Sequence, residues 1–229
     1  MAGLVMTGRH DRLGAVNLKG GRPEKFGRIG SFFYRRLAER TLAPMHRRIA
    51  GEVPIDRGRL LDVGCGPAAL TREIARTRPA LSVLGVDPSP DMIRQARREP
   101  LPPNVELRVA SPATAALSDE IDHAMSVLSF HHWEEPVEEL AAIHRALRPG
   151  GRLWLYEPDP EASDADIAAD RRPMLGFLLL PALERWMERG HGFTAREIER
   201  VVRPAVARTP FCGVAAVRSG SCWRLELEK

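Results

Sequence analysis

Residues 59–67 read Arg-Leu-Leu-Asp-Val-Gly-Cys-Gly-Pro, an apolar run followed by two glycines that are one residue apart. The apolar run has the length and composition of a buried β-strand, and residues 68–78 after it have helical spacing. Glycine lets a backbone approach a ligand closely, and the first turn of a helix presents free N–H groups to an anion. The segment therefore predicts a strand, a tight turn and a helix that together bind a ligand with an anionic group.

The same pattern of strand followed by helix recurs along the chain. Strands are predicted at residues 59–63, 81–86, 105–110, 121–128 and 152–157, and helices at 68–78, 90–98 and 136–147. Alternating strands and helices give right-handed crossovers and a parallel sheet that is covered on both faces. The predicted class is a doubly wound α/β fold, in which ligands bind beyond the carboxyl ends of the strands.

The end of the chain departs from this pattern. Thr194 and Glu197 form a capping-box motif for a helix that runs through Val202. Two β-like runs follow, at residues 211–218 and 222–227, and only three residues separate them. Because a connection this short allows only an antiparallel hairpin, we expect a mostly parallel sheet with an antiparallel terminal hairpin strand.

Two carboxylates indicate what the ligand carries. Asp62 lies two residues before Gly64, where its charge opposes a pyrophosphate but favours an ammonium or sulfonium group. Asp87 ends the second strand and can accept from both hydroxyls of a ribose. Met92, on the following helix, can cover the face of an adenine. The spacing of Gly64 and Gly66 alone also fits a nicotinamide-dependent oxidoreductase, which Asp62 and the terminal hairpin disfavour.

Five segments, taken together in their order and spacing, resemble the class I S-adenosylmethionine-dependent methyltransferases. They are residues 61–66, 87–89, Asp122, 128–133 and 147–151. Within that family the resemblance is to the small-molecule type that includes quinone-biosynthesis enzymes, and it runs from about residue 59 to residue 157. It implies a seven-stranded Rossmann-like sheet, S-adenosylmethionine as the cofactor, and methyl transfer to an O, N or C nucleophile of a small acceptor.

The resemblance also implies a position for each part of the cofactor. The implied contacts are, for the methionine part, Asp62, Gly64, Cys65 and Gly66; for the ribose, Asp87; for the adenine, Pro88, Met92, Ala110 and Ser111; and near the transferable methyl group, Ser126 and His131. Two positions depart from the family pattern. Ala68 stands where many members have a third glycine, and Ser111 stands where the family commonly has an acidic residue. These departures leave open a weakened cofactor site, or a non-catalytic scaffold that keeps the fold.

His131 and His132 are the candidate catalytic residues. Methyl transfer to oxygen or nitrogen needs an in-line nucleophile, and histidine has a pKa suited to removing its proton. The alternative is that these residues only pack the exit of the fourth strand, and that transfer relies on proximity and orientation. Glu157, at the end of the fifth strand, either faces the substrate or is a solvated loop carboxylate.

The domain organisation is predicted to be simple. Residues 1–30 read as a flexible basic segment, and residues 31–229 as a single methyltransferase domain. This domain has an N-terminal helical lid at residues 31–52 and a helical cap insertion at about residues 160–192. The apolar stretch 173–189 of that cap would line the site for an apolar or aromatic acceptor, or alternatively be a helix buried on the sheet or in a homodimer contact.

Charge and cysteine usage narrow the function classes. The first fifty residues hold eleven Lys/Arg and three Asp/Glu, which keeps an RNA or protein methyltransferase as the alternative function. The amino-group motif of nucleic-acid methyltransferases is missing after the fourth strand, so nucleic acid is not the favoured partner. Three cysteines without metal-ligand spacing indicate neither disulfides nor a metal site, and predict a cytoplasmic protein. The longest apolar run, residues 174–183, is too short for a membrane span.

Overall fold

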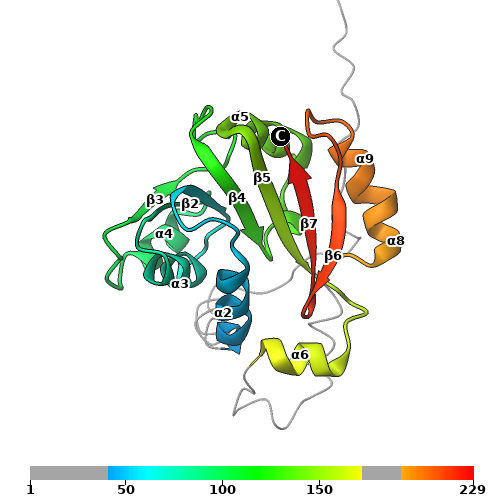
Figure 1. The fold of residues 1–229 in the computed structure, drawn as a ribbon, viewed down its shortest axis with the longest axis horizontal. Helices are drawn as coiled ribbons and strands as arrows, with labels where there is room; N and C mark the ends of the chain where they lie inside the picture. Colours follow the sequence, from blue (N-terminus) through cyan, green and yellow to red (C-terminus); the bar gives the residue numbers. More distant parts are fainter. Residues whose placement is uncertain (1–40, 172–191) are drawn as a thin grey trace, which may run out of the picture.

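A seven-stranded sheet forms the centre of the described structure (Figure 1). The computed structural model describes residues 41–171 and 192–229. In chain order the strands are β1 (Gly58–Val63), β2 (Leu81–Asp87), β3 (Val105–Val109), β4 (Ile121–Val127), β5 (Leu147–Pro158), β6 (Ala215–Ser219) and β7 (Cys222–Glu228). Across the sheet they lie in the order β3-β2-β1-β4-β5-β7-β6.

The strand order reverses beside β1. This strand pairs in parallel with β2 on one side and with β4 on the other, so the chain winds outward from it in both directions. β3 and β5 extend the parallel sheet on the two sides. β7 pairs antiparallel with both β5 and β6. The predicted doubly wound α/β class and the antiparallel terminal hairpin are therefore confirmed.

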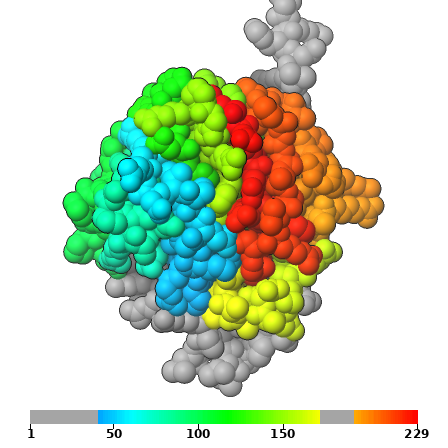
Figure 2. Space-filling model, viewed as in Figure 1, coloured from blue at the N-terminus to red at the C-terminus, as the bar shows by residue number. Residues whose placement is uncertain are grey.

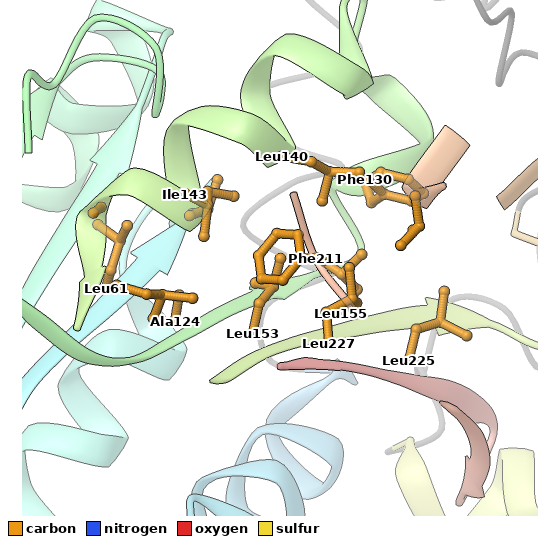
Figure 3. Packing of buried hydrophobic residues seen from close by; sticks show 14 of the residues in the cluster. Leu61, Ala124, Phe130, Leu140, Ile143, Leu153, Leu155, Phe211, Leu225 and Leu227 are labelled. Carbon is orange, nitrogen blue, oxygen red and sulfur yellow. The ribbon is translucent and has the colours of Figure 1, made fainter. Parts of the chain in front are cut away.

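Helices cover both faces of the sheet. They are α2 (Ala43–Glu52), α3 (Ala69–Thr77), α4 (Pro90–Ala96), η1 (Phe130–His132), α5 (Pro136–Ala146), α6 (Asp164–Asp170), α8 (Ala195–Glu197), η2 (Ile198–Val202) and α9 (Arg203–Val206). Leu61 of β1 lies in the cluster that the sheet forms with α5 (Figure 3) and that also includes residues of η2 and α9, whereas its neighbour Leu60 belongs to the cluster with α2 and α3. Burial on both faces explains why the strands read as continuous apolar runs. In the described ranges, no helix is long and apolar enough to cross a membrane.

Most element boundaries agree with the sequence predictions, but the start of β5 and the end of the last helix differ. β5 begins at Leu147, five residues before the predicted start at 152, because Leu147 already pairs with Ile121 of β4 ahead of a register shift. The capping box of Thr194 and Glu197 is present as predicted, with both reciprocal hydrogen bonds formed.

The helix predicted to end at Val202 continues to Val206 through a π turn. In this turn the N–H of Arg203 bonds to the carbonyl of Ile198, five residues earlier. Pro204 follows and has no N–H group, so it cannot supply the next regular helical hydrogen bond. The wider turn lets the helix pass over this missing donor, as single π turns in helices commonly do.

The described part of the predicted lid, residues 41–52, packs one side of α2 against the core. Met45, Ile49 and Ala50 of α2 are buried and pack with α3 and the sheet. Residues 31–40 of the lid and residues 172–191 of the cap lie outside the described residues. The division into a basic segment, a lid and a cap therefore stays a prediction.

An ion-pair network joins α2 to α6 and to the turn between β6 and β7. The Nε and Nη2 atoms of Arg48 donate to the two carboxylate oxygens of Asp170, at 2.8 and 2.7 Å. Asp170 also accepts from the N–H and the hydroxyl of Ser221, at 2.8 and 2.9 Å. Figure 2 shows the result, in which α2, α6 and the β6–β7 hairpin lie side by side on one face. This network fixes where the chain leaves α6.

Candidate functional site

The glycine loop connects β1 to α3 at the point where the strand order reverses. Gly64 and Gly66 have φ values of +71° and +52°, in the left-handed region that favours glycine. The N–H groups of Gly64 and Cys65 both donate to the carbonyl of Val86 in β2, at 2.8 and 3.1 Å. A Cβ atom placed on Gly66 would meet no atom within 4 Å. The loop is therefore fixed on its β2 side and open at Gly66.

Ala68, which stands where a third glycine is expected, is also left-handed. Its φ is +64°, and its side chain is fully buried in a cluster with Ile93 and Leu107. The left-handed conformation costs an alanine about 1–2 kcal/mol, a cost that glycine does not have. The loop thus keeps its conformation with alanine here, and the departure from the family pattern is a source of strain.

Arg72 supports the loop, and the sequence analysis missed it. Its guanidinium is buried, donating to the carbonyl of Pro67 at 2.8 Å and to the carbonyl of Ala96 at the end of α4. The side chain thereby joins the glycine loop to α4. An arginine on a surface helix is normally exposed, so nothing in the sequence marked this one.

Asp87 links the glycine loop to the start of α4. One carboxylate oxygen accepts from the N–H of Gly66 at 3.0 Å, and the other accepts from the N–H of Ser89 at 2.8 Å. Ser89 in turn caps α4 by accepting from the N–H of Met92 at 3.4 Å. Asp87 as a whole is 8% exposed. Asp87 therefore lies at the tip of β2 beside the loop, where the sequence analysis expects a ribose.

Asp62 is buried, and its carboxylate hydrogen-bonds to a side chain of α3. Its Oδ2 atom accepts from the hydroxyl of Thr71 at 2.6 Å. Burial raises the pKa of this carboxyl to about 6, against the opposing effect of the Thr71 hydrogen bond and with a smaller contribution from Asp87. The sequence analysis missed Thr71, which lies nine residues away on the first turn of the helix. A negative charge is thus held at a cost behind the glycine loop.

Replacing Asp62 by asparagine is expected to stabilise the unliganded protein above pH 6. The pKa is higher in the folded chain than the unfolded value near 4, so the stability of the wild type falls as the pH rises from about 4 to about 6. Asparagine is neutral throughout and can still accept from Thr71. We expect a gain of about 2–3 kcal/mol at pH 7 and none below pH 4.

Urea unfolding of D62N and wild type between pH 4 and pH 8 measures this difference. The exposed Asp91 supplies the control, since D91N should show the pH dependence of the wild type. Equal stability of D62N and wild type at pH 7 would mean that the Asp62 carboxylate is not penalised by burial.

The residues expected at the adenine lie around the ends of β2 and β3. Pro88 is exposed and Met92 half-buried, while the N–H of Ala110 donates to the carbonyl of Asp87 at 3.1 Å. Ser111 begins a turn in which its N–H donates to the hydroxyl of Thr114 at 2.8 Å. These four expected residues are therefore brought to one edge, next to Asp87.

Cys65 lies in the loop but its thiol belongs to the packing. The sulfur lies 3.0 Å from where a Cβ on Gly85 would stand, so the side chain fills the space beside β2. Burial raises the pKa of the thiol far above its usual range. Cys65 can therefore contribute its backbone to the site, and its sulfur is unsuited to nucleophilic chemistry.

The end of β4 lies against the glycine loop. Ser126 is fully buried, and its hydroxyl has no hydrogen-bond partner among the described residues. Leu128 has φ +54°, an uncommon conformation for a bulky residue. The hydroxyl of Ser129 would lie 2.1 Å from a Cβ on Gly64, so the Ser129 side chain lies closely against the backbone of Gly64. Strained backbone of this kind gathers at functional sites.

His131 forms a pair with Glu157 across the ends of β4 and β5. Its Nδ1 atom lies 2.5 Å from Oε2 of Glu157, and the other carboxylate oxygen accepts from the N–H of Phe130 at 2.9 Å. Glu157 is fully buried, so the prediction of a solvated carboxylate is wrong. His132 is exposed, and its ring lies 4.0 Å from that of His131, centre to centre.

The structure thus gathers the expected residues at the carboxyl ends of β1, β2, β3 and β4. The glycine loop is the common neighbour, since Asp87 contacts it from β2 and Ser129 from the end of β4. Three supporting contacts were not predicted from the sequence, namely those of Thr71 with Asp62, of Arg72 with the loop, and of His131 with Glu157. Each joins residues whose partner cannot be read from local spacing.

The part of the chain that carries the glycine loop and Asp87 is similar to known methyltransferases. Residues 61–155 match a family described as Methyltransferase domain. The chain is 35% identical over 103 residues to an uncharacterized methyltransferase of Mycobacterium tuberculosis, covering 45% of this chain and 41% of that protein. It is 35% identical over 116 residues to a trans-aconitate 2-methyltransferase of Rhodopseudomonas palustris, covering 49% of this chain and 44% of that enzyme. The chain thus spans less than half the length of these relatives.

Solved structures share the fold over most of the chain. A Methanococcus maripaludis protein assigned as an S-adenosylmethionine-dependent methyltransferase has a TM-score of 0.71 at 18% identity, covering 92% of this chain and 97% of that chain. A methyltransferase of Aquifex aeolicus has a TM-score of 0.61, also at 18% identity, covering 89% and 99%. At these identities the likeness establishes the fold.

Proposed function

We infer that this chain, which belongs through residues 61–155 to the class I S-adenosylmethionine-dependent methyltransferases, transfers the methyl group of that cofactor to a small-molecule acceptor. The observation that carries the proposal is the contact between the N–H of Gly66 and the carboxylate of Asp87, at 3.0 Å. It puts an open glycine loop and a ribose-type carboxylate together at the switch point of a doubly wound sheet.

The residues present fit the cofactor. The open side of Gly66 leaves room for a ligand against the backbone, and the first turn of α3 offers N–H groups to a carboxylate. Asp87 would hold the ribose, while Met92 and the end of β3 at Ala110 and Ser111 would surround the adenine. The buried charge of Asp62 would favour the cationic end of the ligand. When bound, S-adenosylmethionine supplies a methyl group on a sulfonium whose sulfur is the leaving group.

The protein's own part in the reaction is alignment and the exclusion of water. The close approach of Gly64 and Ser129 fixes the loop relative to the end of β4, where Ser126 and His131 would lie near the transferable group. Holding two reactants in line removes much of the entropic barrier of a bimolecular step. The apolar or aromatic character of the acceptor is predicted from residues 173–189, which lie outside the described residues.

A calorimetric titration with S-adenosylhomocysteine tests the proposal. We expect one site per chain, and at a hundredfold excess over Kd an added stability of about 2.7 kcal/mol, or a rise in Tm of about 5–10 °C. NADH is the control ligand, because the nicotinamide alternative uses the same glycines. Binding of NADH without binding of S-adenosylhomocysteine would overturn the proposal, and binding of neither would favour a non-catalytic scaffold.

A further inference from the structure

We propose that the acceptor carries its methyl-accepting atom as a hydroxyl, in an alcohol or a phenol, and that His131, positioned by Glu157, takes the hydroxyl proton. This inference rests on the proposed methyltransferase function. It is carried by the hydrogen bonds of Glu157, whose two carboxylate oxygens are both engaged at the end of the sheet next to the glycine loop.

The pairing selects one form of the His131 ring. A carboxylate can only accept, and one oxygen of Glu157 already accepts from the N–H of Phe130 at 2.9 Å. The Nδ1 atom of His131, 2.5 Å from the other oxygen, is therefore the nitrogen that carries hydrogen. In the neutral ring this leaves the lone pair on Nε2, the form that can take a proton. Glu157 is fully buried, so water does not compete for its oxygens.

The pair lies at the same edge as the cofactor residues. His131 follows Ser129, whose hydroxyl lies against Gly64 of the glycine loop. β4, which leads into this segment, is the neighbour of β1, and Ser126 pairs with Val63 at the strand ends. The His131 side chain keeps 12% of its surface exposed, whereas its partner has none, so the ring is the accessible member. This arrangement is the one that a general base and its orienting carboxylate require.

A base of this kind distinguishes between classes of acceptor. A carboxylic acid has a pKa near 4 and a phenol one of about 10, so at neutral pH the first is already ionised and the second still holds its proton. A carboxylate acceptor, such as the one named in the trans-aconitate methyltransferases, needs no base. An oriented histidine is useful only when the attacking oxygen must lose a proton during the transfer.

In the proposed transfer, each bond that forms is matched by a bond that breaks. A lone pair of the acceptor oxygen forms the new bond to the methyl carbon, and the bond from sulfur to that carbon breaks with its electron pair left on sulfur. The hydroxyl proton goes to Nε2 of His131, and the imidazolium formed is stabilised by the carboxylate of Glu157. The products are a methyl ether and S-adenosylhomocysteine, and His131 releases the proton to solvent.

The variant E157Q separates this role from a purely structural one. Its amide oxygen can still accept from the N–H of Phe130, which places the amide NH₂ group opposite Nδ1 of His131. The NH₂ group donates to Nδ1, so it selects the ring form with hydrogen on Nε2. In that form Nε2 has no lone pair available to take the hydroxyl proton of the acceptor. A carboxylate that only holds η1 in place would allow this exchange with little change, while a positioning residue would not.

The first measurement is nitrogen NMR of the histidine rings in the full chain at pH 7, with the His131 signals identified by their absence in H131N. We expect hydrogen on Nδ1 in the wild type and on Nε2 in E157Q. The exposed Glu161 gives the control E161Q, which should match the wild type. The same ring form in E157Q and the wild type would overturn the positioning role of Glu157, whatever the activity.

The second measurement is methyl transfer to matched acceptors, para-cresol with para-toluate and cyclohexanol with cyclohexanecarboxylate. We expect the hydroxyl member to be methylated and a loss of about 10²–10⁴-fold in E157Q and in H131N, with binding of S-adenosylhomocysteine unchanged. Methylation of the carboxylates in preference, or of neither member, overturns the acceptor class while cofactor binding stands. If the wild type itself does not bind S-adenosylhomocysteine, the proposed function is rejected instead.

Discussion

Exchange of Gly64 for alanine is expected to lower the free energy of unfolding by about 3–4 kcal/mol, and thereby Tm by about 10 °C. The backbone at this position is left-handed, with φ +71°, and the added Cβ would stand 2.1 Å from the hydroxyl oxygen of Ser129 and 2.7 Å from its Cβ. The conformational cost and the overlap act together, because the end of β4 cannot move away without disturbing its pairing with β1.

Gly66 provides the matched control in the same loop. Its φ is +52°, but a Cβ there would meet nothing within 4 Å, so G66A should lose only the conformational term of about 1–2 kcal/mol. Its methyl group would occupy the space assigned to the methionine part of the cofactor, and we expect S-adenosylhomocysteine binding to weaken about tenfold or more. Thermal unfolding and calorimetry on both variants check the pair. Equal losses of stability would contradict the close approach of Gly64 to Ser129.

Asp87 should dominate the affinity for the cofactor. Hydrogen bonds to a charged group contribute about 1.5–3 kcal/mol each, so removing the acceptor for two ribose hydroxyls in D87A is expected to weaken S-adenosylhomocysteine binding about 10²–10⁴-fold. The same change leaves the N–H groups of Gly66 and Ser89 without their present acceptor and should cost about 1–3 kcal/mol of stability. Calorimetric titration and thermal unfolding of the variant give the two quantities separately.

Two further variants sharpen this prediction. D87N keeps the shape and one oxygen but loses the charge, so its affinity should fall between those of the wild type and D87A. D91A removes an exposed carboxylate from the first turn of α4, the helix that follows Asp87, and should bind as the wild type does. If D87A binds S-adenosylhomocysteine with unchanged affinity, the ribose does not lie at Asp87.

Local sequence patterns determined much of the fold. The strand and helix alternation, the short connection at Gly220 and the capping box at Thr194 each depend on residues close in sequence, where spacing and turn chemistry act directly. The boundaries were less accurate where a distant partner decides them. β5 starts early because Leu147 finds Ile121, and the last helix continues because a π turn accommodates Pro204.

In the candidate site, too, the positions of residues were predictable from the sequence, whereas their side-chain partners were not. Gly64, Gly66 and Asp87 were predicted from the strand ends that carry them, and their proximity follows from the parallel topology alone. The direction of a side chain does not follow from topology. Asp62 hydrogen-bonds to Thr71 on the helix behind the loop, and Glu157 is buried against His131, 26 residues away.

The sequence by itself determined the class of fold and, through its resemblance to a known family, the cofactor, and it predicted the edge of the sheet at which that cofactor binds. The fold class rests on periodicity, and the predicted edge rests on glycine and charge at fixed spacing, all of which are local. Only the tertiary structure decided which polar groups pair. A buried carboxylate must find donors wherever the packed elements present them, so the partner of Glu157 could be found only after β4 and β5 had been placed side by side.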